Sequence, residues 1–155
     1  MKRYHGKTIE VRTAIAQPAA FALPAVERIL CDFANPGSAS LALSISELHL
    51  PFQAVISVPV RALVAPGIAR DEWLLQIEAQ QRAALYPVFE GTLRLHRAGR
   101  GSELHLLGHY TVPLGTLGRA IDATLLSGAA ESSLKRFVRE IAHRVAAISQ
   151  WTHIA

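Results

Sequence analysis

Cysteine is nearly absent from this sequence, and aromatic and charged residues are scarce. Of 155 residues one is a cysteine, 6% are aromatic and 18% are charged, against roughly 25% charged in ordinary soluble domains. A single cysteine excludes an internal disulfide. No apolar run approaches the roughly 18 residues that a membrane-spanning helix needs. Because 50% of the residues are apolar, a disordered chain is also excluded, since disorder requires low hydrophobicity and high charge.

Basic residues exceed acidic residues only slightly, and they are scattered along the chain. Sixteen Lys and Arg against twelve Asp and Glu give a net charge of +4, and Arg94, Arg97 and Arg100 form a close set of cations. A nucleic-acid-binding protein usually gathers cations on one face and interleaves aromatic residues for stacking. No aromatic residue lies within this set. We therefore expect no nucleic-acid partner.

The length of 155 residues is that of one domain, and tails are expected at residues 1–5 and 151–155. Lys7, Glu10 and Arg12 follow the basic start and interrupt the apolar stretch that a signal peptide requires. Cytoplasmic localisation is therefore expected.

The first part of the chain predicts a strand followed by helix. Ile9 and Val11 recur with period two within residues 7–16, which indicates a strand. Residues 19–33 follow Pro18 and are rich in Ala and Leu, which favours a helix. Pro24 lies within this segment and suggests that it forms two short helices. Cys31 is expected to be a buried helical thiol.

From residue 38 to residue 113 the hydrophobic period is two. Successive strands are predicted over residues 41–45, 52–64, 73–79, 87–97 and 103–112, and Gly99 and Gly101 mark a hairpin turn. Clean alternation on consecutive strands indicates an antiparallel sheet with one buried face.

Residues 116–150 predict a long final helix whose apolar stripe changes phase. One line contains Leu117, Ile121 and Leu125, and a second line begins at Leu134. The two lines differ by roughly 150° around a helix that advances about 100° per residue. An irregularity is therefore predicted over residues 127–133, where Gly128 lowers helix stability.

This order of elements, an α+β arrangement, resembles the helix-grip fold of the START-like, polyketide-cyclase-like (SRPBCC) superfamily. The resemblance is most specific in a Phe-x-Gly strand, a Gly-rich hairpin and a Gly-x-Tyr-x-x-Pro-Leu-Gly junction, formed here by Phe89, Gly91, Gly108, Tyr110, Pro113, Leu114 and Gly115. It implies a curved antiparallel sheet of about six to seven strands wrapped on a long C-terminal helix, with short N-terminal helices after the first strand. It also implies a cavity for a small hydrophobic or aromatic ligand, lipid-like or polyketide-like.

The expected ligand-binding residues share the apolar face of the sheet or the first half of the final helix. They are Trp73, Phe89, Leu93, Leu106, Tyr110, Leu117, Ile121 and Leu125. Tyr110 is the expected orienting group, because a buried phenol normally has a hydrogen-bond partner.

No metal, cofactor or catalytic residue is predicted. His105 and His109 have a helical metal-ligand spacing, but on a strand they lie about 13 Å apart, too far for one zinc ion. Two other interpretations remain open. In the first, the protein is a cyclase or aromatase-type enzyme that acts through Tyr110. In the second, it is an interaction protein whose exposed apolar patch binds a partner protein or a second copy of the chain to form a homodimer.

Overall fold

A computed structural model describes residues 5–34, 40–44, 55–79, 88–112 and 123–152. The elements are β1 (His5–Ile15), α1 (Ala19–Ala34), β2 (Ser40–Ser44), β3 (Val55–Pro66), β4 (Glu72–Ala79), β5 (Val88–Ala98), β6 (Gly101–Val112) and α2 (Ala123–Thr152). This order confirms the predicted α+β class. β1 begins at His5 and α2 ends at Thr152.

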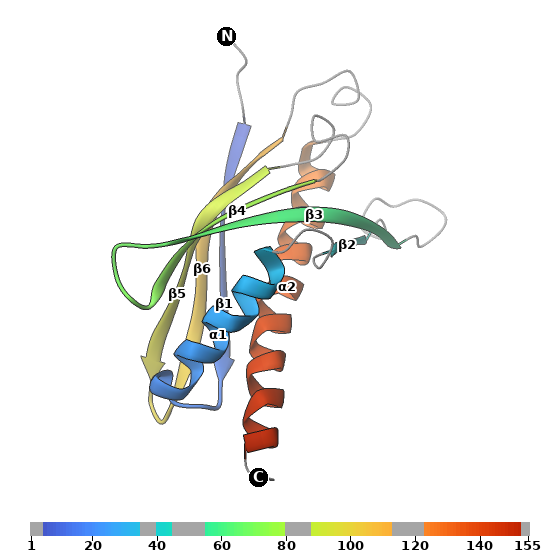
Figure 1. The fold of residues 1–155 in the computed structure, drawn as a ribbon. Helices are drawn as coiled ribbons and strands as arrows, with labels where there is room; N and C mark the ends of the chain where they lie inside the picture. The colour runs from blue at the N-terminus through green and yellow to red at the C-terminus, as the bar shows by residue number, and fades with distance from the viewer. Residues whose placement is uncertain (1–4, 35–39, 45–54, 80–87, 113–122, 153–155) are drawn as a thin grey trace.

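The described strands form an antiparallel sheet in the order β1-β6-β5-β4-β3-β2 (Figure 1). One continuous ladder joins β1, β6, β5, β4 and β3. The short β2 pairs with the N-terminal part of β3, from Val55 to Pro59. A two-residue turn joins β5 to β6, and Gly99 adopts a φ of 59° in this turn, a conformation that glycine adopts without steric cost.

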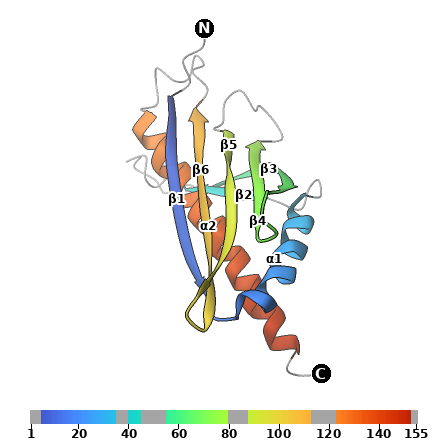
Figure 2. The same cartoon turned by 90° about the vertical axis from the view of Figure 1, so that its left-hand side faces the viewer.

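Both helices lie on the same face of the sheet, which is its concave face. α2 contacts β1, β2 and β6, whereas α1 packs on β3, β5, β6 and α2. In Figure 2 the strands stand in front of α2, and no described helix covers the face turned to the viewer. The concave face therefore forms the core, and the described part of the opposite, outer face is open.

α1 is one helix of 16 residues, so the prediction of two short helices is wrong. Its first turn is closed by the backbone N–H groups of Phe21 and Ala22, which donate to the Pro18 carbonyl at 3.0 and 2.9 Å. Pro24 cannot donate a hydrogen bond to the Ala20 carbonyl. Both Ala20 and Pro24 are exposed, so water can satisfy that carbonyl and the helix continues.

α2 is one helix over residues 123–152, so no break divides it within residues 127–133. The change of buried face predicted there stays a prediction, because the side chains of residues 123–130 lie outside the described set. The described second half of α2 has one buried stripe, formed by Leu134, Phe137, Val138, Ile141 and Val145. None of the described helices combines the length and the apolar character needed to cross a bilayer.

Candidate functional site

Five of the predicted ligand-binding residues lie together on the concave face, in two cross-strand rows. The deep row contains Trp73 opposite Leu93 and Leu93 opposite Leu106. The edge row contains Ile77 opposite Phe89 and Phe89 opposite Tyr110.

Leu117 and Ile121, predicted as the helical cover of this site, fall outside the described residues. Leu125 lies within α2, but its side chain is also outside the described set. The sheet half of the predicted site is therefore assembled, and its helical half stays a prediction.

A pair of glycines separates the two rows. Gly91 lies opposite Gly108 and Leu75 opposite Gly91, so these three residues form a glycine row between the deep row and the edge row. The Phe89 ring covers the gap, because its Cζ would lie 2.6 Å from a Cβ on Gly91 and 2.7 Å from a Cβ on Gly108. The sequence placed both glycines in strand interiors; their pairing and the ring over them come from the strand register.

Both rows are buried, and the two leucines of the deep row are the most enclosed. Leu93 and Leu106 in the deep row have 0% exposed surface, so protein atoms surround both side chains. Phe89 and Trp73 retain 4% and 5%, and Tyr110 retains 2%. The edge row lies near the ends of β4, β5 and β6, where the chain leaves the sheet at Ala79 and Val112 and enters it at Val88.

The concave face carries no charge in its described centre. The inward side chains that β4, β5 and β6 contribute to these rows are apolar or aromatic, and Tyr110 and Trp73 carry the polar groups among them. On β1, Ile9 and Val11 continue the glycine row and the deep row, whereas Lys7 is paired with Tyr110 and its side chain lies outside the described set. A charged ligand would lose hydration at the deep row without compensation, whereas a neutral apolar ligand would not.

A groove on the outer face was missed by the sequence analysis. It has a volume of about 590 Å³ and crosses β3, β4, β5 and β6. Its lining forms three adjacent cross-strand rows: Leu63, Gln76, Glu90 and His109 (the Glu90 row); Val64, Leu75, Gly91 and Gly108 (the extended glycine row); and Ala65, Leu74, Thr92 and Leu107 (the Leu74 row).

The floor of this groove is the backbone of the extended glycine row. The side chains of Val64 and Leu75 in this row point to the concave face, and Gly91 and Gly108 have none. Leu63, Leu74 and Leu107 line the groove with 43%, 47% and 46% of their surface exposed. Leu74 and Leu107 are leucines on the otherwise polar sides of β4 and β6. That departure from alternation is a sequence signal that could have revealed the groove.

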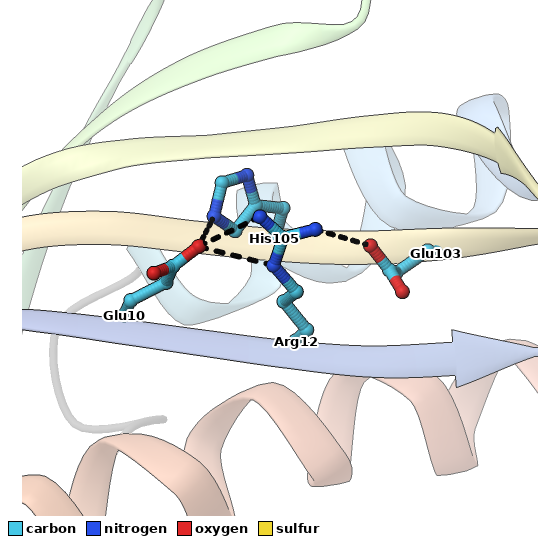
Figure 3. A network of polar contacts seen from close by, with 4 residues as sticks. All are labelled: Glu10, Arg12, Glu103 and His105. Atoms are coloured by element: carbon cyan, nitrogen blue, oxygen red, sulfur yellow. Dashed lines mark hydrogen bonds and ion pairs between the residues drawn. The ribbon is translucent and has the colours of Figure 1, made fainter.

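The outer face also carries an ion-pair network centred on Glu10 of β1 (Figure 3). Glu10 Oε1 accepts hydrogen bonds from Arg12 Nη2 at 2.8 Å and from His105 Nε2 at 2.8 Å. Arg12 Nη1 lies 3.6 Å from Glu103 Oε1. The hydrogen bond from Arg12, followed by that from His105, holds the pKa of Glu10 below its ordinary value of 4.5. The same contact with Glu10 raises the pKa of Arg12.

The two histidines with metal-ligand spacing lie apart on this outer face. His105 contacts Glu10, whereas His109 Nε2 lies 3.7 Å from Glu90 Oε2. Within the described part of the chain, no group of three or more potential metal ligands is assembled. Cys31 is exposed, so the prediction of a buried thiol is wrong. The buried stripe of α1 runs through Ile29, Leu30 and Phe33 and turns Cys31 outward.

The fold matches solved structures, whereas the sequence itself matches no protein-family model and no curated protein. The Zhui aromatase/cyclase from Streptomyces sp. R1128 superposes with a TM-score of 0.56 at 14% identity, covering 92% of this chain and 94% of that chain. TTHA0849 from Thermus thermophilus superposes with a TM-score of 0.53 at 13% identity, covering 92% and 99%. Ara h 8.0201 gives a TM-score of 0.53 at 11% identity, also covering 92% and 99%.

These matches extend over nearly the whole chain and include both helices and the sheet. At such identities they concern the fold alone, and they agree with the resemblance seen in the Phe-x-Gly strand and the Gly-x-Tyr junction. The chain has the helix-grip fold.

Proposed function

We propose that this protein binds a small, uncharged, hydrophobic or aromatic molecule, lipid-like or polyketide-like, at the edge row of the concave face. The observation that carries the proposal is the aromatic pair of Phe89 and Tyr110, which lie opposite each other in the edge row, with Trp73 in the deep row of the same buried face. Binding sites for small molecules are mostly apolar, with a few polar groups that orient the ligand. The Tyr110 hydroxyl would be the orienting group.

Phe89 would form the floor of the site. Its ring separates the edge row from the enclosed Leu93 and Leu106 by lying over the glycine pair. Leu117, Ile121 and Leu125 would cover the ligand from the helical side. The ligand would then lie between these residues and the Phe89 ring.

Titration with N-phenyl-1-naphthylamine, a neutral fluorescent probe, tests this proposal in a Trp151→Phe background that leaves Trp73 as the only tryptophan. We expect one probe per chain and quenching of Trp73 emission. Tyr110→Phe should weaken binding several-fold while the fold is retained, because the ring stays and only the hydrogen-bonding group is lost.

Phe89→Leu and Phe33→Leu provide a matched pair of variants, since both shorten a buried aromatic residue. Only Phe89 belongs to the proposed site; Phe33 packs between the two helices. Probe affinity should change at least tenfold in Phe89→Leu and stay unchanged in Phe33→Leu. Equal effects, or no saturable binding in the parent protein, would refute the proposal. Native mass spectrometry of the purified protein would identify a natural ligand that stays bound.

A cyclase or aromatase-type activity is the second candidate, and Tyr110 favours it as a titratable hydroxyl on the concave face. Pocket enzymes of this type act largely by positioning and desolvation. If the protein has such an activity, Tyr110→Phe should abolish turnover of a bound substrate. The affinity for that substrate should fall by a smaller factor than the turnover rate.

A further inference from the structure

The outer-face groove has dimensions that select the kind of molecule it can hold. Its two walls, the Glu90 row and the Leu74 row, are two residues apart along each strand, or roughly 6.6 Å. A helix with its side chains is about 10–12 Å wide and would not enter. A second copy of this open sheet face would leave the hollow empty and lose contacts along its lining. The volume of about 590 Å³ lies within the range of roughly 300–1,000 Å³ common for small-molecule sites.

The two walls differ in chemistry. The Leu74 row presents Leu74 and Leu107, which are about half exposed, with Thr92 between them. The opposite wall presents the side chains of Gln76, Glu90 and His109. An occupant therefore needs one apolar edge and one edge that donates hydrogen bonds. Because the groove spans four strands, it is about 14 Å long at roughly 4.8 Å per strand interval.

Glu90 supplies the charge that the occupant must complement. Its side chain is 57% exposed, and its carboxylate lies 3.7 Å from His109 Nε2, a distance too long for a hydrogen bond. Two nearby cations whose side chains the structure describes pair with other carboxylates, Arg94 with Glu72 and Arg12 with Glu10. The Glu90 carboxylate can thus accept a hydrogen bond from a bound ammonium group, and such charge-assisted bonds are the strong ones.

We propose that this groove is a second binding site, separate from the concave face, for an elongated amphipathic amine. Its hydrocarbon body lies along Leu74 and Leu107, and its ammonium group donates to Glu90. The site does not depend on the function proposed for the concave face, because it lies on the opposite face of the sheet and the side chains of its two walls point away from that face.

Three probes with one hydrocarbon chain and different end groups test the charge requirement: octylammonium, 1-octanol and octanoate. Calorimetry should show octylammonium binding at least tenfold more tightly than either of the others, and more weakly at high salt because exposed charges are screened. Glu90→Gln should remove this preference. In methyl-labelled protein, the signals of Leu74 and Leu107 should shift on titration.

Leu107→Ser and Ile68→Ser form the matched pair of variants. Both replace an exposed aliphatic side chain, but Ile68 lies in the turn between β3 and β4, outside the groove, with its side chain fully exposed. Octylammonium affinity should fall about tenfold in Leu107→Ser and stay unchanged in Ile68→Ser. Equal affinity for the three probes, unshifted Leu74 and Leu107 methyls, or equal effects of the two variants would overturn the proposal. Shifts confined to Leu93 and Leu106 would overturn it too and would locate binding on the concave face.

Discussion

The glycine pair on β5 and β6 is a position where a single methyl group would matter. A Cβ on Gly91 would lie 2.6 Å from the Leu107 carbonyl oxygen and 2.8 Å from Gly108 Cα. Backbone atoms of a paired strand cannot move aside as a flexible side chain can. The absence of a side chain at these positions is therefore a structural requirement of the sheet.

We predict that Gly91→Ala destabilises the protein by about 1–3 kcal/mol, the usual cost of overpacking, as measured by urea denaturation. Gly108→Ala should cost a similar amount, because its Cβ would meet the Glu90 carbonyl oxygen and Gly91 Cα. Thr92→Ala on the open outer face serves as the control and should have a small effect. A neutral Gly91→Ala variant would show that β5 and β6 are not this close.

The Glu10 network predicts a pH-dependent contribution to stability. Its folded-state pKa is lowered by hydrogen bonds from Arg12 and His105, so the contribution is present above the unfolded-state pKa and is lost as pH falls through the folded value. Glu10→Gln should lower the melting temperature at neutral pH, and this difference should shrink toward about pH 3. Glu140→Gln, which breaks an i,i+4 pair with Arg144 on α2, is the control and should have a smaller effect at neutral pH. A Glu10→Gln difference that grows on acidification would contradict the assigned direction.

Among the elements, α1 and α2 meet through an aromatic contact. The Phe33 and Phe137 ring centroids lie 5.2 Å apart at an interplanar angle of 58°, and Arg144 Cζ lies 4.8 Å from the Phe33 centroid. Tilted aromatic pairs and cation–π contacts are favourable beyond the area they bury. This junction fixes how the two helices sit relative to each other over the concave face.

A double-mutant cycle with Phe33→Leu and Phe137→Leu should give a coupling energy of about 0.5–1.5 kcal/mol. The measurement is the free energy of unfolding of the parent, both single variants and the double variant. A parallel cycle of Phe33→Leu with Thr92→Ala, on the opposite face of the sheet, should give a value near zero. Coupling of the same size in both cycles would mean that the aromatic contact is not responsible.

Across the molecule, the first strand completes the sheet beside the last. β1 pairs with β6 along its length, with Ile9 opposite Gly108 and Ile15 opposite Ser102. Ile9, Val11 and Ile15 are all buried by this pairing. Because β1 and β6 are far apart in the sequence, the long chain segment between them must be brought into a closed loop before their stabilising contacts can form. Sheets with such pairing therefore fold slowly.

We therefore predict refolding over milliseconds to seconds rather than microseconds, the range of topologies dominated by non-local pairing. Stopped-flow Trp fluorescence after dilution from urea measures this rate, and Val11→Ala should speed unfolding more than it slows refolding if β1 docks late. Refolding complete within microseconds would contradict the long-range pairing of β1 with β6.

The element order and the inward or outward face of each described strand could be predicted from the residues alone. Alternation in β4, β5 and β6 placed Trp73, Leu93 and Tyr110 on the buried side, because side chains on a strand point to opposite faces with period two. Local turn chemistry likewise placed the hairpin at Gly99. These features depend on neighbouring residues along the chain, which a sequence displays directly.

The identity of cross-strand neighbours, by contrast, emerged only with the folded sheet. The opposition of Gly91 and Gly108, the Phe89 ring above them and the three rows of the outer groove follow from register, which depends on partner strands distant in sequence. The continuity of α1 through Pro24 and the exposure of Cys31 likewise depend on how the helix sits on the sheet. Period two assigns a side chain to a face of the sheet, but it does not assign it a partner.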